Sequence, residues 1–164
     1  VDISGGRTVA VRARHLVIKM SERNPVEPIR LPGALRRAMA SASSIVFPES
    51  TSLVVDGREY ILVIVNQLSS ANPMGYCGAG EEGEVYALQI AGAKAETRFS
   101  ALVQSCLKNI DLASDGVLPP ARSVSWNPVP AGIRIAWMSD ARGEEATHIY
   151  QYERGEFVEG PGEK

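Results

Sequence analysis

Hydrophobic and polar residues alternate with a period of two along much of the chain, the pattern of half-buried β-strands. The alternation runs over 7–20, where we expect a strand bent near His15, and it returns over 99–107. The run Tyr60–Val65 is apolar without a break, as in a central strand covered on both faces. We therefore expect a mainly β fold: an antiparallel sheet or a β-sandwich-like domain.

Two pairs of these strand-like runs are expected to form hairpins. The dipeptide Asp56-Gly57 separates the run 53–55 from Tyr60–Val65, and it is typical of a type I′ turn. A second hairpin is expected between 123–126 and 133–138. Further strands are expected over 84–91, 148–152 and 156–158.

A helical pattern covers about residues 32–46. Leu35 and Met39 follow helical spacing, Pro32 suits a first helical turn, and Pro48 ends the segment. We expect this one principal helix to pack on the sheet.

The length of 164 residues suits a single domain, 1–164, with a frayed tail over about 159–164. Its apolar runs are shorter than the roughly 20 residues of a transmembrane helix, so we expect no membrane span. The chain begins at Val1-Asp2 without a Met, which we interpret as the site where a signal peptide was removed. Trimming of a disordered cytosolic start would look the same. We expect an exported, periplasmic protein.

Charge is unevenly distributed. The net charge is −2, but residues 1–47 carry eight Lys/Arg against three Asp/Glu, and the remainder carries nine against sixteen. This asymmetry can steer a charged partner or can be surface patterning alone. The basic residues of the first part lack the interleaved aromatic residues of single-strand binding, so we expect no nucleic-acid partner. They are Arg12, Arg14, Lys19, Arg36 and Arg37.

The two cysteines, Cys77 and Cys106, lie 29 residues apart, and neither belongs to a CxxC pair. With only two histidines in the chain, a zinc site would need other ligands, so we expect no metal and no cofactor. An exported chain favours a disulfide, which would stabilise the fold by about 3–4 kcal/mol in the chain-entropy model. The alternative is two buried thiols in a cytosolic protein.

The glycine-rich segment 72–83 and the acidic residues of the chain suggest three kinds of chemical site. A nucleophilic Cys77 needs a base such as His15 or His148, and its acidic neighbours disfavour the thiolate. A phosphate loop would end in Gly-Lys-Ser/Thr, which is missing here. A carboxylate pair for glycoside hydrolysis is available in the chain, but loop carboxylates are usually solvated. The candidates for that pair are Glu81, Glu82, Glu84, Glu144 and Glu145.

Aromatic residues also flank the second hairpin. We interpret Trp126 and Trp137 as cross-strand or core packing residues in preference to a carbohydrate platform. The histidines fall within strand-like segments and are interpreted as sheet residues.

Two segments together carry a resemblance. The first is Gly75-Tyr76-Cys77-Gly78-Ala79-Gly80-Glu81-Glu82, and the second is Gln104-Ser105-Cys106-Leu107-Lys108-Asn109-Ile110. They resemble small exported proteins of Gram-negative bacteria that carry a GxCGAGxE loop. Some periplasmic proteins of this kind look like immunity proteins, which neutralise peptidoglycan amidases delivered by type VI secretion. The resemblance implies a disulfide between the two cysteines and transfers no catalytic residue.

We therefore predict a non-catalytic binding protein that inserts the loop 69–84 into the active-site cleft of a secreted peptidoglycan amidase. The small polar residues of the loop would bind catalytic groups, its two large side chains would anchor the contact, and its acidic pair would meet a basic rim. These predicted contact residues are Ser69, Ser70, Asn72, Met74, Tyr76, Glu81 and Glu82. The alternatives are a thiol- or carboxylate-based hydrolase and a structural or accessory module of the cell envelope.

Overall fold

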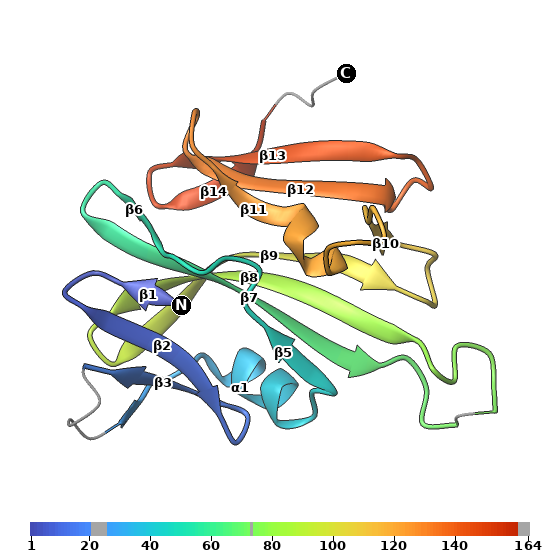
Figure 1. Cartoon of the computed structure of the whole chain (residues 1–164), viewed down its shortest axis with the longest axis horizontal. Coiled ribbons are helices and arrows are strands. Elements are labelled where there is room, and N and C mark those ends of the chain that lie inside the picture. Colours follow the sequence, from blue (N-terminus) through green and yellow to red (C-terminus); the bar gives the residue numbers. More distant parts are fainter. Residues whose placement is uncertain (21–25, 73, 161–164) are drawn as a thin grey trace.

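The computed structural model describes residues 1–20, 26–72 and 74–160. Three antiparallel sheets are stacked in layers (Figure 1), so the expected β-rich fold is confirmed. The central sheet has the order β5-β7-β8-β9, and β6 also pairs with β7. Its strands are β5 (Ser44–Val46), β6 (Leu53–Val55), β7 (Arg58–Leu68), β8 (Glu81–Ala91) and β9 (Lys94–Ser105).

The N-terminal sheet lies on one face of the central sheet, together with the helix α1 (Gly33–Ala40). It contains β1 (Asp2–Ile3), β2 (Arg7–Arg12), β3 (His15–Lys19) and β4 (Glu27–Pro28) in that order. The C-terminal sheet covers the other face and has the order β10-β12-β13-β14, with β11 also paired to β12. Its strands are β10 (Asp111–Leu112), β11 (Val124–Asn127), β12 (Gly132–Ser139), β13 (Ala146–Glu153) and β14 (Glu156–Glu159), and a short 3-10 helix covers Pro120–Ser123.

Strand β7 separates two hydrophobic cores. Ile61, Val63 and Val65 pack toward the N-terminal sheet and α1. Tyr60, Leu62 and Ile64 pack toward the C-terminal sheet. Because successive side chains of a strand point to opposite faces, an unbroken apolar run is what a strand between two cores requires. The predicted central strand is therefore confirmed.

Both predicted hairpins are present. Asp56 and Gly57 have φ values of 50° and 69°, as a type I′ turn requires. Strands β11 and β12 pair from Val124↔Ile135 to Asn127↔Gly132.

The single bent strand expected over 7–20 is wrong. The chain reverses at Ala13-Arg14, where φ is 47° and 64°, and β2 pairs with β3 from Arg12↔His15 onward. Neither turn residue is a glycine or an asparagine, so the alternation continues through the turn without a sequence signal.

The helix is shorter than the expected 32–46. It ends at Ala40, and Ser44–Val46 forms β5 on the edge of β7. Serines and β-branched residues are poor helix formers, and Ile45 and Val46 instead complete the central sheet. The packing of the helix on the sheet through the buried Leu35 and Met39 is as expected.

The last strand, β14, ends at Glu159, the position where the expected frayed tail begins. Residues 161–164 of that tail lie outside the described residues. Within the described parts of the chain, no helix has the length and apolar character needed to cross a membrane.

Candidate binding site at the disulfide-linked loop

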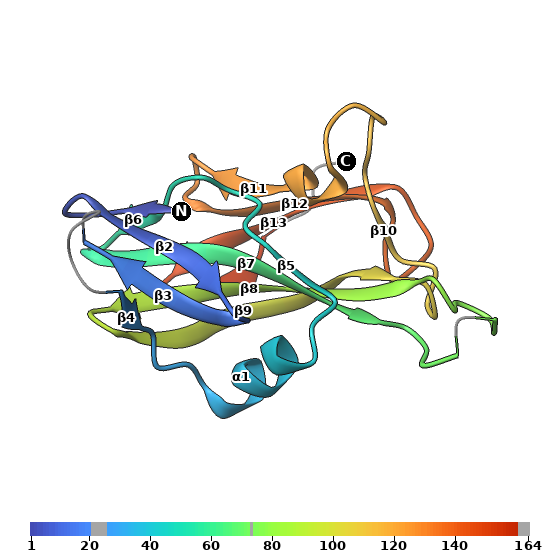
Figure 2. The ribbon, with the colours of Figure 1, turned by 60° about the horizontal axis from the view of Figure 1, so that its bottom comes forward.

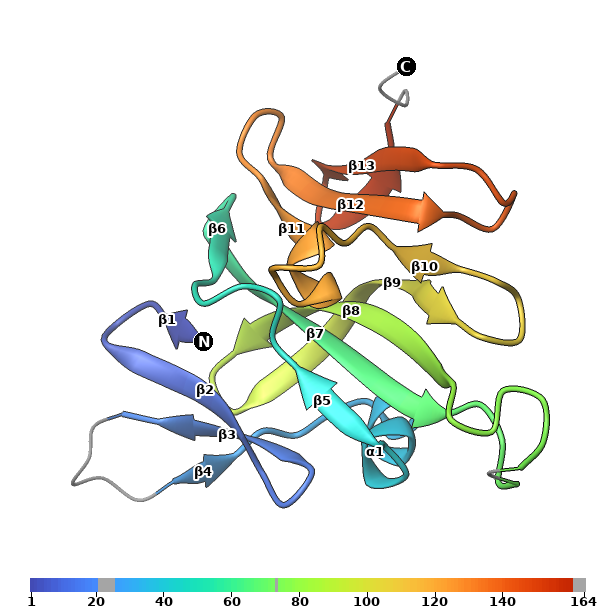
Figure 3. The same ribbon diagram turned by 45° about the vertical axis from the view of Figure 1, so that its right-hand side comes forward.

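The loop 69–80 connects β7 and β8 and projects from one end of the molecule (Figures 2 and 3). It is described except at residue 73. The two strands stay in register to Leu68↔Glu81, and the Ser69 N–H donates to the Gly80 carbonyl at 2.9 Å. The loop therefore starts from a regular hairpin with a fixed base.

A disulfide fastens this loop to the end of β9. Cys77 and Cys106 are bonded, with their Cα atoms 5.8 Å apart, so the predicted pairing is confirmed. Gly80 allows the close approach, because a Cβ at this position would lie 2.5 Å from Cys106 Cβ and 2.8 Å from its Sγ. With both sulfurs bonded, neither is free to act as a nucleophile.

The carboxylate of Glu82 connects three segments beneath the disulfide. It accepts hydrogen bonds from Ser69 Oγ at 2.6 Å, from the Leu107 N–H at 3.2 Å, and from Ser105 Oγ. Burial would raise the pKa of Glu82, but the hydrogen bonds from Ser105, Ser69 and Leu107 outweigh it and hold the pKa below its ordinary value. Both carboxylate oxygens accept hydrogen bonds within the chain, so Glu82 supports the base of the loop, and its contact with a partner stays a prediction.

Other polar residues of the predicted site shape the loop itself. Ser70 Oγ accepts from the Asn72 N–H at 3.1 Å, and Asn72 Oδ1 accepts from the Met74 N–H at 3.1 Å. Such local bonds stabilise tight turns. Glu81 accepts from Ser43 Oγ at 2.7 Å, which fixes this carboxylate at the base of the loop.

The large apolar side chains of the loop point into solvent. Met74 is 94% exposed and Tyr76 is 75% exposed. Leu68 and Leu107, at the base, are 61% and 54% exposed. We call these four residues the loop patch. Leu68 and Leu107 were not among the predicted contact residues, because their only signal in the sequence is their position beside the loop and beside Cys106.

Two hollows flank the base of the loop and share Leu68. One, of about 350 Å³, includes Gly80, Cys106 and Asp111 in its lining. The other, of about 390 Å³, includes Arg14 in its lining. Leu68 thus stands between two concave surfaces at the base of the loop.

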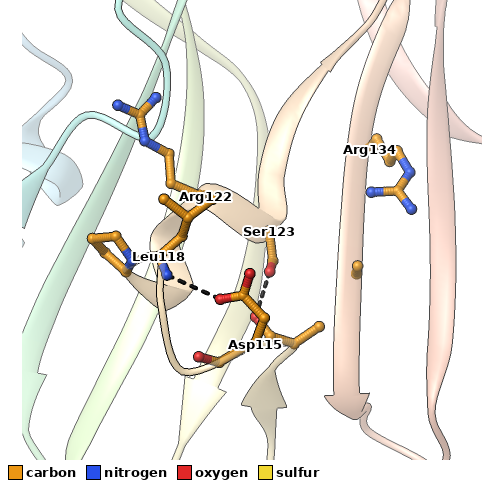
Figure 4. A pocket seen from close by; sticks show the side chains of 9 residues that line it. Asp115, Leu118, Arg122, Ser123 and Arg134 are labelled. Atoms are coloured by element: carbon orange, nitrogen blue, oxygen red, sulfur yellow. Dashed lines mark hydrogen bonds between the residues drawn. The ribbon is translucent and has the colours of Figure 1, made fainter.

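A hollow of about 410 Å³ lies apart from the loop, between the segment 113–123 and β12 (Figure 4). Asp115 Oδ1 accepts the N–H groups of Val117 and Leu118 at 2.9 Å, and Arg122 Nη1 donates to the Pro48 carbonyl at 3.0 Å. These two charged residues hold the segment in place, so we assign them a structural role.

The two histidines, which were considered as bases for Cys77, lie on strands β3 and β13. His15 begins β3 and is exposed. His148 lies in β13, and its ring nitrogens face Asp140 and Glu159. Among the described residues, no three His, Cys, Asp or Glu side chains form a cluster that could hold a metal ion.

Comparisons of the chain with protein-family models, with curated proteins and with solved structures found no match.

Proposed function

We propose that the chain is a non-catalytic binding protein of the periplasm, an immunity protein that inhibits a secreted cell-wall hydrolase. The loop 69–80 enters the active-site cleft of the hydrolase, and the loop patch supplies the contact. The partner class, a peptidoglycan amidase delivered by type VI secretion, comes from the resemblance of the Gly75–Glu82 and Gln104–Ile110 segments to small exported proteins.

One observation carries the proposal: two large apolar side chains are displayed on a loop that is held in shape at several points. Met74 and Tyr76 are exposed, while the disulfide and the Glu82 hydrogen bonds fix the loop beneath them. Exposed apolar side chains that cluster mark interaction sites in soluble proteins. A loop that is already ordered loses little conformational entropy on binding, which favours tight inhibition.

The disulfide supports the proposed location. Disulfides persist in oxidising compartments such as the bacterial periplasm and are rare in the cytosol. In this proposal the carboxylate of Glu81, which accepts from Ser43 at the base of the loop, meets a basic rim around the partner's cleft and speeds association.

The proposal predicts that a small exported hydrolase is encoded beside the gene for this chain, and the test uses that hydrolase. The purified hydrolase is incubated with peptidoglycan, and the release of soluble fragments is measured with increasing amounts of the oxidised protein. We expect inhibition to be complete near equimolar concentrations. A small exported hydrolase that keeps full activity at a large excess of the protein would contradict the proposal, as would the lack of such a neighbouring gene.

A further inference from the structure

The excess positive charge in the first part of the chain lies on one layer of the molecule. Residues 1–47 carry eight Lys/Arg against three Asp/Glu. They include the N-terminal sheet and α1, which cover the same face of the central sheet (Figures 1 and 2). We call six exposed residues of this layer the basic face: Arg12, Arg14, Lys19, Arg30, Arg36 and Arg37.

Alternation along the extended chain directs three of these side chains away from the protein. Each follows an apolar residue that packs toward the central sheet: Arg12, Lys19 and Arg30 come directly after Val11, Ile18 and Ile29. Because successive side chains point to opposite faces, the three charged side chains lie on the outer surface of the N-terminal sheet.

The other three basic residues lie where α1 meets the β2–β3 turn. Arg14 Nη1 donates to the Ala40 carbonyl at 2.7 Å, at the C-terminal end of α1. Arg36 and Arg37 precede Ala40 by four and three residues, a spacing that makes residues neighbours on a helix surface. The buried Leu35 and Met39 face the sheet instead. The three arginines therefore come from one small area of the surface.

The charge of the basic face is not neutralised within the described residues. None of its six members forms an ion pair there, whereas Arg7 pairs with Glu59 at 3.3 Å and Arg98 pairs with Glu96 at 2.6 Å. The acidic residues that the structure describes in 1–47 are Asp2 and Glu27, and both are exposed. A surface with such an excess of one sign attracts an anionic partner.

The composition of this layer distinguishes between anionic partners. Residues 1–46 contain no Phe, Tyr or Trp. Aromatic side chains anchor protein interfaces and stack on the bases of single-stranded nucleic acids, so neither partner is favoured. Attraction to anionic lipid headgroups needs only clustered Lys and Arg. Met20, which follows Lys19 and is 56% exposed, offers an apolar side chain to the headgroup layer.

We propose that the basic face binds the surface of a bilayer that contains anionic phospholipids. Its guanidinium and ammonium groups donate hydrogen bonds to the headgroup phosphates, and each adds about fivefold to the binding constant. The protein lies on the membrane surface and does not cross it. The loop patch is made of other residues, so this inference does not depend on the proposed function.

The experiment measures sedimentation of the oxidised protein with lipid vesicles at neutral pH. One set is phosphatidylcholine alone, and the other contains about 30% phosphatidylglycerol. In about 0.1 M NaCl we expect binding to the anionic vesicles only, and in about 1 M NaCl, where the Debye length falls from about 10 Å to about 3 Å, we expect that binding to be lost. A protein that stays in solution with the anionic vesicles at the lower salt overturns the proposal, as does equal binding to both sets.

Paired substitutions locate the binding surface. Arg36→Gln with Arg37→Gln, and Arg12→Gln with Lys19→Gln, should each weaken binding about 25-fold. Arg134→Gln with Arg142→Gln removes the same charge from β12 and the turn after it and should bind as the wild type does. The unfolding temperature of each variant confirms that it is folded. If this control loses as much affinity as the other two pairs, binding follows net charge and the basic face is not the site.

Two soluble polyanions test the other partner classes. Duplex DNA and poly-glutamate are compared with the anionic vesicles at equal concentrations of negative charge. We expect the vesicles to bind most tightly. Tighter binding of either polymer would assign the basic face to a nucleic acid or to an acidic protein and would overturn the lipid assignment.

Discussion

Gly80 lies against Cys106 so closely that no other residue fits without a shift of the disulfide. We expect Gly80→Ala to lower the free energy of unfolding by about 1–3 kcal/mol through overpacking. Gly33→Ala is the matched control: the added Cβ meets only the flexible Arg37 side chain at 3.6 Å, and alanine favours the helix. Urea unfolding of both variants measures the difference. Equal stability of the two would show that the contact at Gly80 relaxes freely.

The disulfide should stabilise the fold because it closes a loop between cysteines 29 residues apart and so lowers the conformational entropy of the unfolded chain. For the double variant Cys77→Ser, Cys106→Ser we expect a loss of about 3–4 kcal/mol in the free energy of unfolding. Reduction of the wild-type protein provides the matched comparison and should give a similar loss. A double variant as stable as the oxidised protein would mean that the Glu82 hydrogen bonds hold the loop by themselves.

Glu82 should make stability depend on acid pH. Its folded pKa is lowered, so its ionised form stabilises the fold above the ordinary glutamate pKa of about 4.3, and this contribution is lost as the pH falls through the folded pKa. Glu82→Gln should cost about 1–3 kcal/mol at neutral pH and should lose less stability than the wild type on acidification. Thermal unfolding from pH 7 down to pH 3 measures both effects.

The exposed Glu145 in the turn between β12 and β13 provides the control for that series. Glu145→Gln should follow the wild-type pH profile. If Glu82→Gln also follows it, Glu82 is not the group that links folding of the loop base to pH.

Tyr76 should be an anchor of the proposed interface. Tyr76→Ala should weaken inhibition of the hydrolase by about 2 kcal/mol, near thirtyfold, without changing the unfolding temperature, because its side chain is largely solvated in the free protein. Val129→Ala truncates another largely exposed apolar side chain (86%), in the β11–β12 turn, and should leave inhibition unchanged. If both variants inhibit the hydrolase equally well, Tyr76 does not contact the hydrolase.

Much of the fold follows from patterns that are local in the sequence. The apolar run Tyr60–Val65 and the Asp56-Gly57 dipeptide were sufficient for β7 and its hairpin. The turn at Ala13-Arg14 was missed because no residue there has an intrinsic preference for positive φ. The helix was predicted too long because pairing with β7 decides the structure of Ser44–Val46.

The disulfide was predicted, but the internal contacts of the loop base were not. The pairing of Cys77 with Cys106 is as expected. The role of Glu82 was not predictable, because its partner Ser105 is 23 residues away and reaches it only through the β8–β9 pairing.

The register Leu68↔Glu81 at the mouth of the β7–β8 hairpin has a consequence for engineering and for divergence among relatives. The loop 69–80 is held by the paired strand ends at its base, by the disulfide of Cys77 and by the close packing of Gly80. We therefore expect that its outer residues can be exchanged without disturbing either hydrophobic core. The framework is thus suited to grafting: we expect that new sequences placed between the hairpin ends would change the surface that the loop displays while the three stacked sheets stay the same.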